Sequence, residues 1–145
     1  VSPALTRYGT STNVLGSDTE VQAHTLIAKS NATNGYTITV KGETLTAETK
    51  TIAAIGGINS APAIGTEQFG IRLTANGGSG TSTSPYNGTG FAYAATATTS
   101  SSVAMTSVGD NATTTYSVRY VANIAPLTPA AVYGANVIYV VTANF

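Results

Sequence analysis

His24 is the only histidine in the chain, and histidine is the side chain most often used as a general base near neutral pH. A serine hydrolase needs that base beside an orienting acid, and Asp18 and Glu20 lie close to it in the sequence. However, no Gly-x-Ser-x-Gly motif supplies the nucleophile. We therefore interpret His24 as an ordinary strand histidine.

The remaining chemistry-bearing residues do not form a recognisable catalytic set. Glu43, Glu48 and Glu67 lie apart in turn or loop segments, so a glycosidase-type pair of carboxylates is not indicated by their spacing. The chain contains no cysteine, which removes thiolate metal sites and cysteine nucleophiles, and it has no calcium-loop motif. The sequence predicts neither an enzyme, nor a cofactor, nor a metal site.

A glycine-rich stretch at residues 77–80 superficially resembles a phosphate-binding loop. Such a loop must lead into a helix whose N-terminus holds the anion. Here Pro85, Tyr86 and an Asn-Gly pair follow instead, and the whole segment from Thr74 to Gly90 is rich in Gly, Ser and Thr. We expect a long surface loop there.

Three Asn-x-Thr motifs are candidate N-glycosylation positions. All three fall in segments that we predict to be turns or loops, where a glycan can be accommodated. The acceptor residues are Asn31, Asn87 and Asn111.

The composition limits the partners. The 145 residues carry a net charge of zero and only 8 % charged residues, so no cationic surface is available for nucleic acid. The 26 threonines and 13 serines keep the surface wet without charge. No run of about 20 apolar residues predicts a membrane span. The chain begins with Val1, which is typical of a secreted protein after removal of a signal peptide, so we expect an extracellular location.

Short runs in which apolar and polar residues alternate predict β-strands, and no window has helical spacing. The clearest runs start at Tyr36, Phe69 and Tyr116, and Asn-Gly pairs, the best short hairpin signal, separate several candidate strands. The sequence therefore predicts an all-β, antiparallel β-sandwich of the immunoglobulin-like or jelly-roll kind, with a closed barrel as the alternative. Residues 16–145 form one domain in this interpretation.

Residues 1–15 are interpreted as an N-terminal extension that leaves its own domain as a donor strand. The segment is low in charge, and a polar hinge at residues 16–18 separates it from the next strand. An ordinary first strand is the alternative. The alternating face that would be buried consists of Ala4, Thr6, Tyr8, Thr10, Thr12 and Val14.

The segment from Val132 to Phe145 predicts a long final strand with apolar residues on both faces, which requires cover on both sides. We expect it to border the groove that accepts a donor strand. The acceptor residues would be Val137, Tyr139 and Val141. The aromatic last residue, Phe145, predicts a chain end inside a sheet.

Several segments of the chain resemble a family of secreted prokaryotic β-sandwich proteins, from about residue 31 to the end. The segments that carry the likeness are Asn34-Gly35-Tyr36-Thr37-Ile38-Thr39-Val40, Glu67-Gln68-Phe69-Gly70-Ile71-Arg72-Leu73-Thr74-Ala75-Asn76, Thr115-Tyr116-Ser117-Val118-Arg119-Tyr120-Val121-Ala122-Asn123-Ile124 and the Pro-Ala-x-x-Tyr ending with its Thr-Ala-x-Phe tail.

The closing segment, residues 129–145, also resembles the end of chaperone-usher pilins and spore-coat-U-type domains. This likeness implies a subunit of an extracellular fibre, joined to copies of itself by donor-strand complementation as in bacterial pili, archaeal thread filaments and archaeal bundling pili. Chaperone-usher pilins usually carry a cysteine pair, which this chain lacks, so an archaeal-type or other self-assembly route stays open.

Two functions compete at this stage. In the first, the protein is a structural subunit of a cell-surface filament such as a pilus or thread-like fibre. In the second, it is a monomeric secreted surface or adhesin-type binding module that uses the Thr74 to Gly90 segment as its recognition surface.

Overall fold

The computed structural model describes residues 21–145, and among these residues every regular element is a β-strand. The residues predicted to form a donor strand, Ala4 to Val14, lie outside this range. The strands are β1 (Val21–Ser30), β2 (Tyr36–Gly42), β3 (Thr46–Ala47), β4 (Lys50–Thr51), β5 (Gly56–Ser60), β6 (Gln68–Asn76), β7 (Thr81–Ser82), β8 (Phe91–Tyr93), β9 (Ser101–Thr106), β10 (Asp110–Asn123) and β11 (Val137–Ala143).

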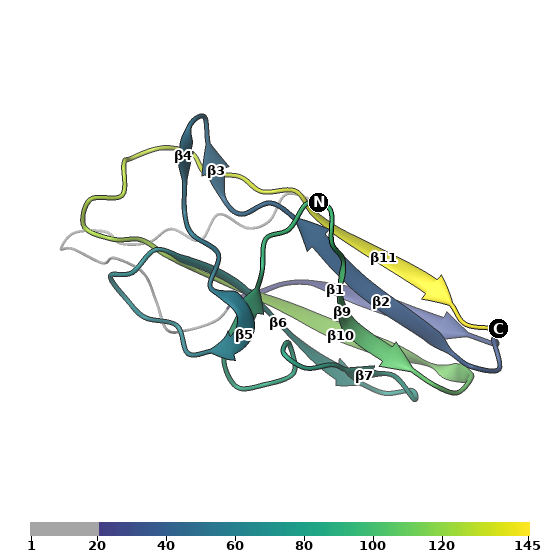
Figure 1. The fold of residues 1–145 in the computed structure, drawn as a ribbon. Coiled ribbons are helices and arrows are strands. Elements are labelled where there is room, and N and C mark those ends of the chain that lie inside the picture. The colour runs from purple at the N-terminus through teal and green to yellow at the C-terminus, as the bar shows by residue number, and fades with distance from the viewer. Residues whose placement is uncertain (1–20) are drawn as a thin grey trace.

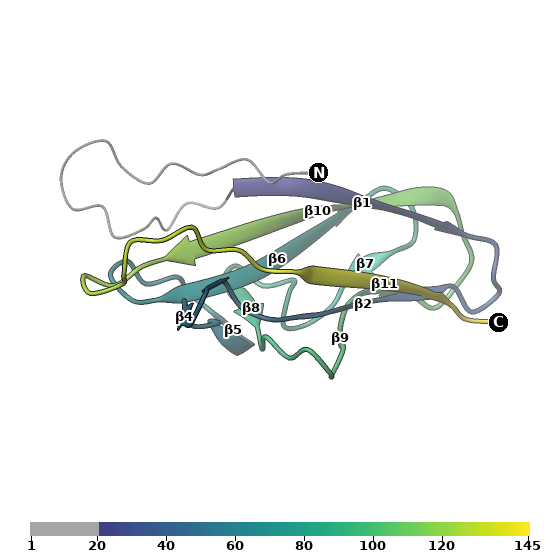
Figure 2. The same ribbon diagram turned by 90° about the horizontal axis from the view of Figure 1, so that it is seen from above.

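The strands form two facing layers, which confirms the predicted antiparallel sandwich (Figures 1 and 2). One sheet has the order β1-β10-β6-β8-β5, and the other has the order β11-β2-β9-β7. A two-stranded hairpin of β3 and β4 stands apart. The longest strand, β10, pairs with β1 along one side and with β6 along the other.

The sequence suggested that the three Asn-Gly pairs close hairpins. In the structure they lie in connections between the two sheets instead. They lie between β1 and β2, between β6 and β7, and between β7 and β8, and each of these pairs of strands is divided between the sheets. Gly35 shows why glycine is needed: its φ is +71°, and an added Cβ would lie 2.4 Å from the carbonyl oxygen of Thr106. No L side chain with a Cβ fits this crossing without a shift of backbone.

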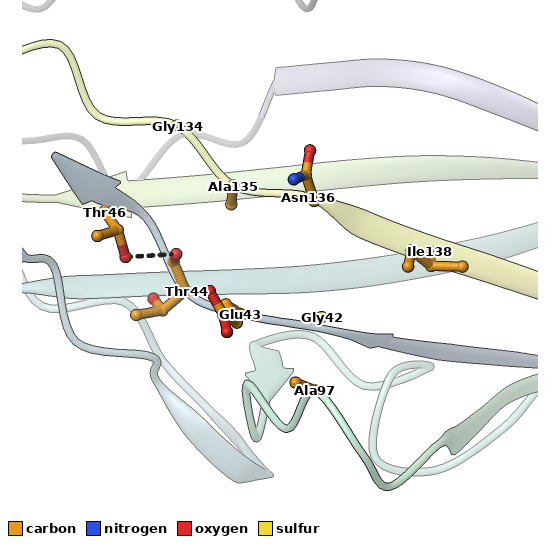
Figure 3. Close-up of a pocket in the computed structure, with 9 residues that line it drawn as sticks. All are labelled: Gly42, Glu43, Thr44, Thr46, Ala97, Gly134, Ala135, Asn136 and Ile138. Atoms are coloured by element: carbon orange, nitrogen blue, oxygen red, sulfur yellow. Dashed lines mark hydrogen bonds between the residues drawn. The ribbon is translucent and has the colours of Figure 1, made fainter. Parts of the chain in front are cut away.

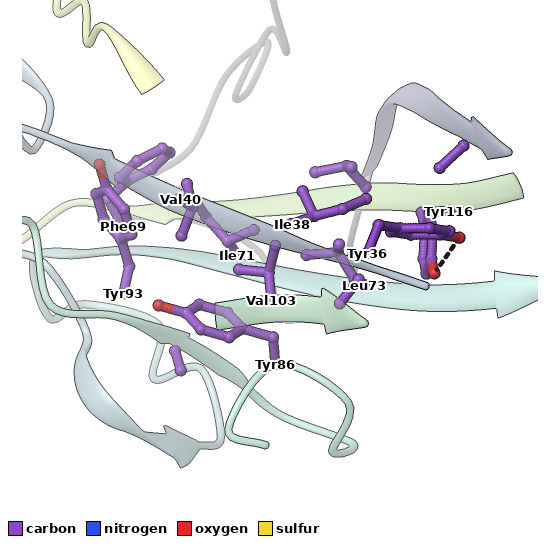
Figure 4. Close-up of a cluster of buried hydrophobic side chains, with 14 residues drawn as sticks. Tyr36, Ile38, Val40, Phe69, Ile71, Leu73, Tyr86, Tyr93, Val103 and Tyr116 are labelled. Carbon is purple, nitrogen blue, oxygen red and sulfur yellow. Dashed lines mark hydrogen bonds between the residues drawn. The ribbon is translucent and has the colours of Figure 1, made fainter. Parts of the chain in front are cut away.

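The core lies between the layers, and the inward faces of β2, β6 and β10 contribute most of its large side chains (Figure 4). The alternation predicts it well: Ile38, Ile71 and Val118 are each 0 % exposed. Full burial of one such side chain contributes about 1.5–3 kcal/mol. The sequence did not predict the members contributed by short or irregular segments, which are Tyr86, Tyr93 and Val103.

Two expectations about segments were wrong. Residues 74–90 are not one surface loop, because Tyr86 is 1 % exposed and its carbonyl oxygen accepts a hydrogen bond of 2.9 Å from the Leu73 amide. The final strand is shorter than residues 132–145. Gly134 forms an isolated bridge with Thr46, which holds the chain before Val137 away from the β2 ladder, and Phe145 is 93 % exposed beyond the last pair.

Candidate functional site

The inward face of β11 is the most unusual part of the sandwich. In an antiparallel pair, residues directly opposite each other point to the same side of the sheet. Val141 lies opposite Ile38, and Ile38 points into the core with 0 % exposure. Val141 therefore points inward as well, yet 59 % of it is exposed.

This exposure arises because β11 is the outermost strand of its sheet and β1 is the outermost strand of the facing sheet. The two strands belong to different sheets and are not paired with each other. On β1, Leu26 and Ala28 lie opposite the buried Tyr116 and Thr114 and so point inward too. We call the space bordered by the inward faces of these two edge strands the seam.

The seam is closed along part of its length by three aromatic rings from three strands. The His24 ring lies 5.8 Å from that of Tyr120 and 5.7 Å from that of Tyr139, and the hydroxyls of the two tyrosines are 3.0 Å apart. Partial burial lowers the pKa of His24, which keeps the imidazole neutral. Burial raises the pKa of Tyr120 and of Tyr139, so the hydrogen bond between them joins two neutral phenols.

Beyond these rings, on the side of Val141 and Ala143, no described side chain covers the inward face of β11 to the same degree. Ala143 lies opposite the buried Tyr36 and is itself exposed. The seam is thus closed near Tyr139 and open near Val141.

The backbone edge of β11 is also unoccupied on one side within residues 21–145. Every residue from Val137 to Ala143 pairs with β2, and no second strand of the described chain pairs with it. A row of unpaired amide and carbonyl groups at a sheet edge is a template for another strand. Its outer face is apolar as well, since Ile138 is 49 % and Val140 is 42 % exposed.

The three residues predicted to line an acceptor groove therefore lie together on the seam side of β11. Val137 and Tyr139 are half-buried. The same alternation of apolar residues also predicts that Val141 belongs to the core of its own domain. This prediction is wrong, because 59 % of Val141 is exposed and no described strand covers the end of β11 on which it lies. Alternation indicates the side to which a residue points, and the facing neighbour decides whether that side is covered.

The candidate glycosylation positions Asn31, Asn87 and Asn111 are all exposed. Asn31 and Asn87 lie in the connections after β1 and after β7, as expected. Asn111 does not lie in a turn but is the second residue of β10, because β10 begins at Asp110 and pairs with the end of β1 there. The side-chain amide of Asn87 donates a hydrogen bond of 3.2 Å to the carbonyl oxygen of Ser82.

Buried polar groups gather around Asp110, and no motif in the sequence indicates them; we call them the Asp110 cluster. Asp110 is 0 % exposed and accepts hydrogen bonds from the hydroxyls of Tyr36 (3.0 Å) and Thr114 and from the amide of Ser79 (2.9 Å). Since Tyr36 gives its proton to Asp110, Tyr116 donates to Tyr36 across 3.0 Å. Burial alone raises the pKa of Asp110, but hydrogen bonds led by that of Thr114 outweigh it, and the net shift is downward.

The glycine-rich stretch serves this cluster. Gly77 and Gly78 have φ values of +71° and +51°, and the next two amides, those of Ser79 and Gly80, donate to Asp110 and Thr114. A Cβ on Gly78 would lie 2.5 Å from the Asp110 carboxylate. Backbone amides in such a turn can bind an anion; here the Ser79 amide binds the Asp110 carboxylate, and the Gly80 amide binds the Thr114 hydroxyl that donates to it.

A shallow depression of about 590 Å³ lies where β2 ends and β11 begins (Figure 3). Among the described residues that line it, Glu43 is the only ionisable one, and Ile138 connects the depression with the outer face of β11. The reciprocal backbone bonds between Thr46 and Gly134, of 2.8 and 3.0 Å, close it at one side. Within residues 21–145, no three His, Cys, Asp or Glu side chains come together as metal ligands.

Comparison with family models, with curated proteins and with solved structures finds no match to this chain. In the part of the chain that the structure describes, no helix has the length and apolar character needed to cross a membrane.

Proposed function

We propose that this protein is a structural subunit of an extracellular, cell-surface filament, and that residues 1–15 of one copy insert as a strand into the seam of the next. The observation that carries this proposal is the contrast between Val141 and its cross-strand partner Ile38. Both point inward, but Ile38 is 0 % exposed and Val141 is 59 % exposed. A strand added to β11 would cover Val141.

The free backbone edge of β11 supports the same function. An added strand gains main-chain hydrogen bonds for affinity and places alternate side chains in the seam for specificity. The neutral, threonine-rich composition favours close lateral packing of copies, because few charges would be desolvated. A head-to-tail exchange of strands remains open and gives a fibre, whereas a reciprocal exchange closes into a dimer.

The alternative, a monomeric binding module that uses residues 74–90, has less support. The middle of that segment is anchored in the core by Tyr86 and in the Asp110 cluster by Ser79 and Gly80.

The test compares the full chain with a variant that lacks residues 1–15. Electron microscopy should show fibres of the full chain and none of the truncated protein. A labelled peptide of residues 1–15 should bind the truncated protein, as measured by fluorescence anisotropy, and should restore its solubility.

Two matched peptides sharpen this test. Tyr8→Asp places a charge on the face expected to enter the seam and should abolish peptide binding, whereas Ser11→Asp lies on the opposite face and should bind within a few-fold of the natural peptide. A full-length protein that stays monomeric at high concentration, or a truncated protein that forms the same fibres, contradicts the proposal.

A further inference from the structure

The loop between β10 and β11, residues 124–136, exposes two large apolar side chains almost completely. Leu127 is 92 % exposed and Val132 is 90 % exposed. The loop has a defined shape, because the Thr128 amide and hydroxyl both bond to Ala125 (3.0 and 2.8 Å) and the Tyr133 hydroxyl donates to the Pro129 carbonyl (2.9 Å). An ordered, uncharged and apolar surface loop is typical of an interaction surface.

The connection between β5 and β6 lies at the same end of the sandwich and carries another exposed apolar residue (Figure 1). Glu67 accepts a hydrogen bond of 2.6 Å from the Thr128 hydroxyl, which ties the connection between β5 and β6 to the loop. Ile64, on this connection, is 57 % exposed. We call the surface of Ile64, Leu127 and Val132 the loop end.

The opposite end of the sandwich is apolar too. Phe145 is 93 % exposed and Val108 is 54 % exposed. Asn144 exchanges backbone hydrogen bonds with Asn34 (3.2 Å) and Gly35 (2.9 Å), and a Cβ on Gly35 would lie 2.7 Å from the Val108 carbonyl oxygen, so these residues gather in one place. We call the surface of Val108 and Phe145 the tail end.

The direction of the chain relates the loop end to the proposed strand exchange. Val21 begins β1 opposite Tyr120, close to Asn123, where β10 ends and the apolar loop starts. Residues 1–20 therefore join the described domain at its loop end. Five residues, 16–20, reach at most about 17 Å when fully extended. A neighbour that holds residues 1–15 must lie against this end.

We infer that the loop end of one copy docks on the tail end of the next copy. The inference rests on the proposed function and adds the partner surface. Residues 124–136, 106–109 and 143–145 contain no charged side chain, so the contact desolvates few charges. The charged neighbours of the loop end are Glu67, which bonds to Thr128, and Glu48 and Lys50, which line one depression with Val132. Because the two surfaces differ, the contact is heterologous, and it builds an open fibre when the rotation between successive copies does not close a ring.

Cysteine cross-linking tests this contact directly, because the natural chain contains no cysteine. A full-length Leu127→Cys, Val108→Cys double variant, polymerised and then treated with a short bismaleimide, should give a ladder of covalent oligomers on a denaturing gel. Each single variant should give none. The control is Ile27→Cys with Val108→Cys, since Ile27 is 69 % exposed on the side of β1 away from the core and should not form a ladder.

A second variant measures the importance of the contact. Leu127→Asp with Val132→Asp should raise the critical concentration for polymerisation at least tenfold. Both side chains are nearly fully exposed, so the fold and the binding of the 1–15 peptide to a truncated form should remain unchanged.

The outcomes separate this inference from the proposed function. Fibres without a ladder from the double variant overturn the docking contact and leave strand exchange intact. Cross-linked dimers from Leu127→Cys alone indicate a contact between two loop ends and also overturn it. Absence of fibres, with no binding of the 1–15 peptide, overturns both.

Discussion

The Asp110 cluster and the seam are neighbours, since Thr114 of the cluster pairs with Ala28 at the border of the seam. They differ in how far the chain completes them. The cluster buries a carboxylate, which is costly, and surrounds it with donors from β2, β10 and the glycine-rich stretch. The seam is lined by apolar side chains, whose burial has no such desolvation cost, and it leaves one of them, Val141, 59 % exposed. The domain therefore supplies all these hydrogen-bond donors to the buried Asp110 carboxylate itself, and it leaves an apolar edge that a partner can cover.

The largest expected effect is the difference between two substitutions at one cross-strand pair. Ile38→Asp buries an unpaired carboxylate at a cost of several kcal/mol and should yield no soluble folded protein. Val141→Asp should fold, with a loss of about 1 kcal/mol or less, because the new charge reaches water. Circular dichroism melting curves measure the difference, and equal damage by both would show that the seam is covered within the monomer.

Removal of the acid at the centre of the cluster should have the next largest effect. Asp110→Ala leaves the buried hydroxyls of Tyr36 and Thr114 without their acceptor, and we expect a loss of about 3 kcal/mol in the free energy of unfolding. Urea denaturation of the two proteins measures it. Glu48→Ala, at an exposed turn position, is the control and should change stability by less than about 0.5 kcal/mol.

The two regions should also respond to acid in different pH ranges. The pKa of Asp110 is lower in the folded protein than its ordinary value of 3.8. The ionised carboxylate therefore adds its full contribution to the free energy of unfolding above pH 3.8, and this contribution is lost as the pH falls through the folded pKa. His24 also has a lowered pKa, from 6.5, and the unfolded chain binds its proton first. Stability should therefore begin to fall below pH 6.5.

A pH series of urea denaturation curves separates these two contributions. His24→Gln should remove the decrease in the free energy of unfolding that starts near pH 6.5 and leave the decrease below pH 3.8. Asp110→Asn should do the reverse. An unchanged slope in His24→Gln would mean that the histidine is not shielded by the tyrosines at the closed part of the seam.

The smallest expected effect concerns the hydrogen bond that closes part of the seam. Tyr139→Phe keeps the ring but removes one partner of the 3.0 Å bond to Tyr120, which should cost about 1 kcal/mol. Tyr133→Phe removes a bond on the exposed loop and is the matched control, with a loss of less than about 0.5 kcal/mol. Equal losses in both variants would contradict a structural role for the closed part of the seam.

Alternation in the sequence was sufficient to predict the fold class and the inward faces of β2, β6 and β10. It works there because each of these strands lies between two others, so the side to which a residue points also decides whether the residue is buried. It failed at Val141, where the facing neighbour is missing. That information depends on tertiary contacts between strands far apart in the sequence.

Two buried residues could not be predicted because their local sequence is typical of turns. Tyr86 follows a proline in a segment rich in glycine and serine, and its burial depends on contacts with distant strands, such as the hydrogen bond from the Leu73 amide to its carbonyl oxygen. Asp110 follows a glycine and precedes an asparagine, which favours an exposed turn. Its donors come from residues up to 74 positions away, so no local pattern contains them.

The pairing of β1 with β10 has a mechanical consequence. In a fibre built by strand exchange, tension enters each subunit at Val21 and acts along β1. The ladder between β1 and β10 extends from Val21 to Ser30 and lies parallel to that pull, so its hydrogen bonds share the load in shear and do not open one after another. β10 is in turn paired with β6 from Thr115 to Asn123, which passes the load to the middle of the sheet. The first described strand would thus anchor the subunit against traction.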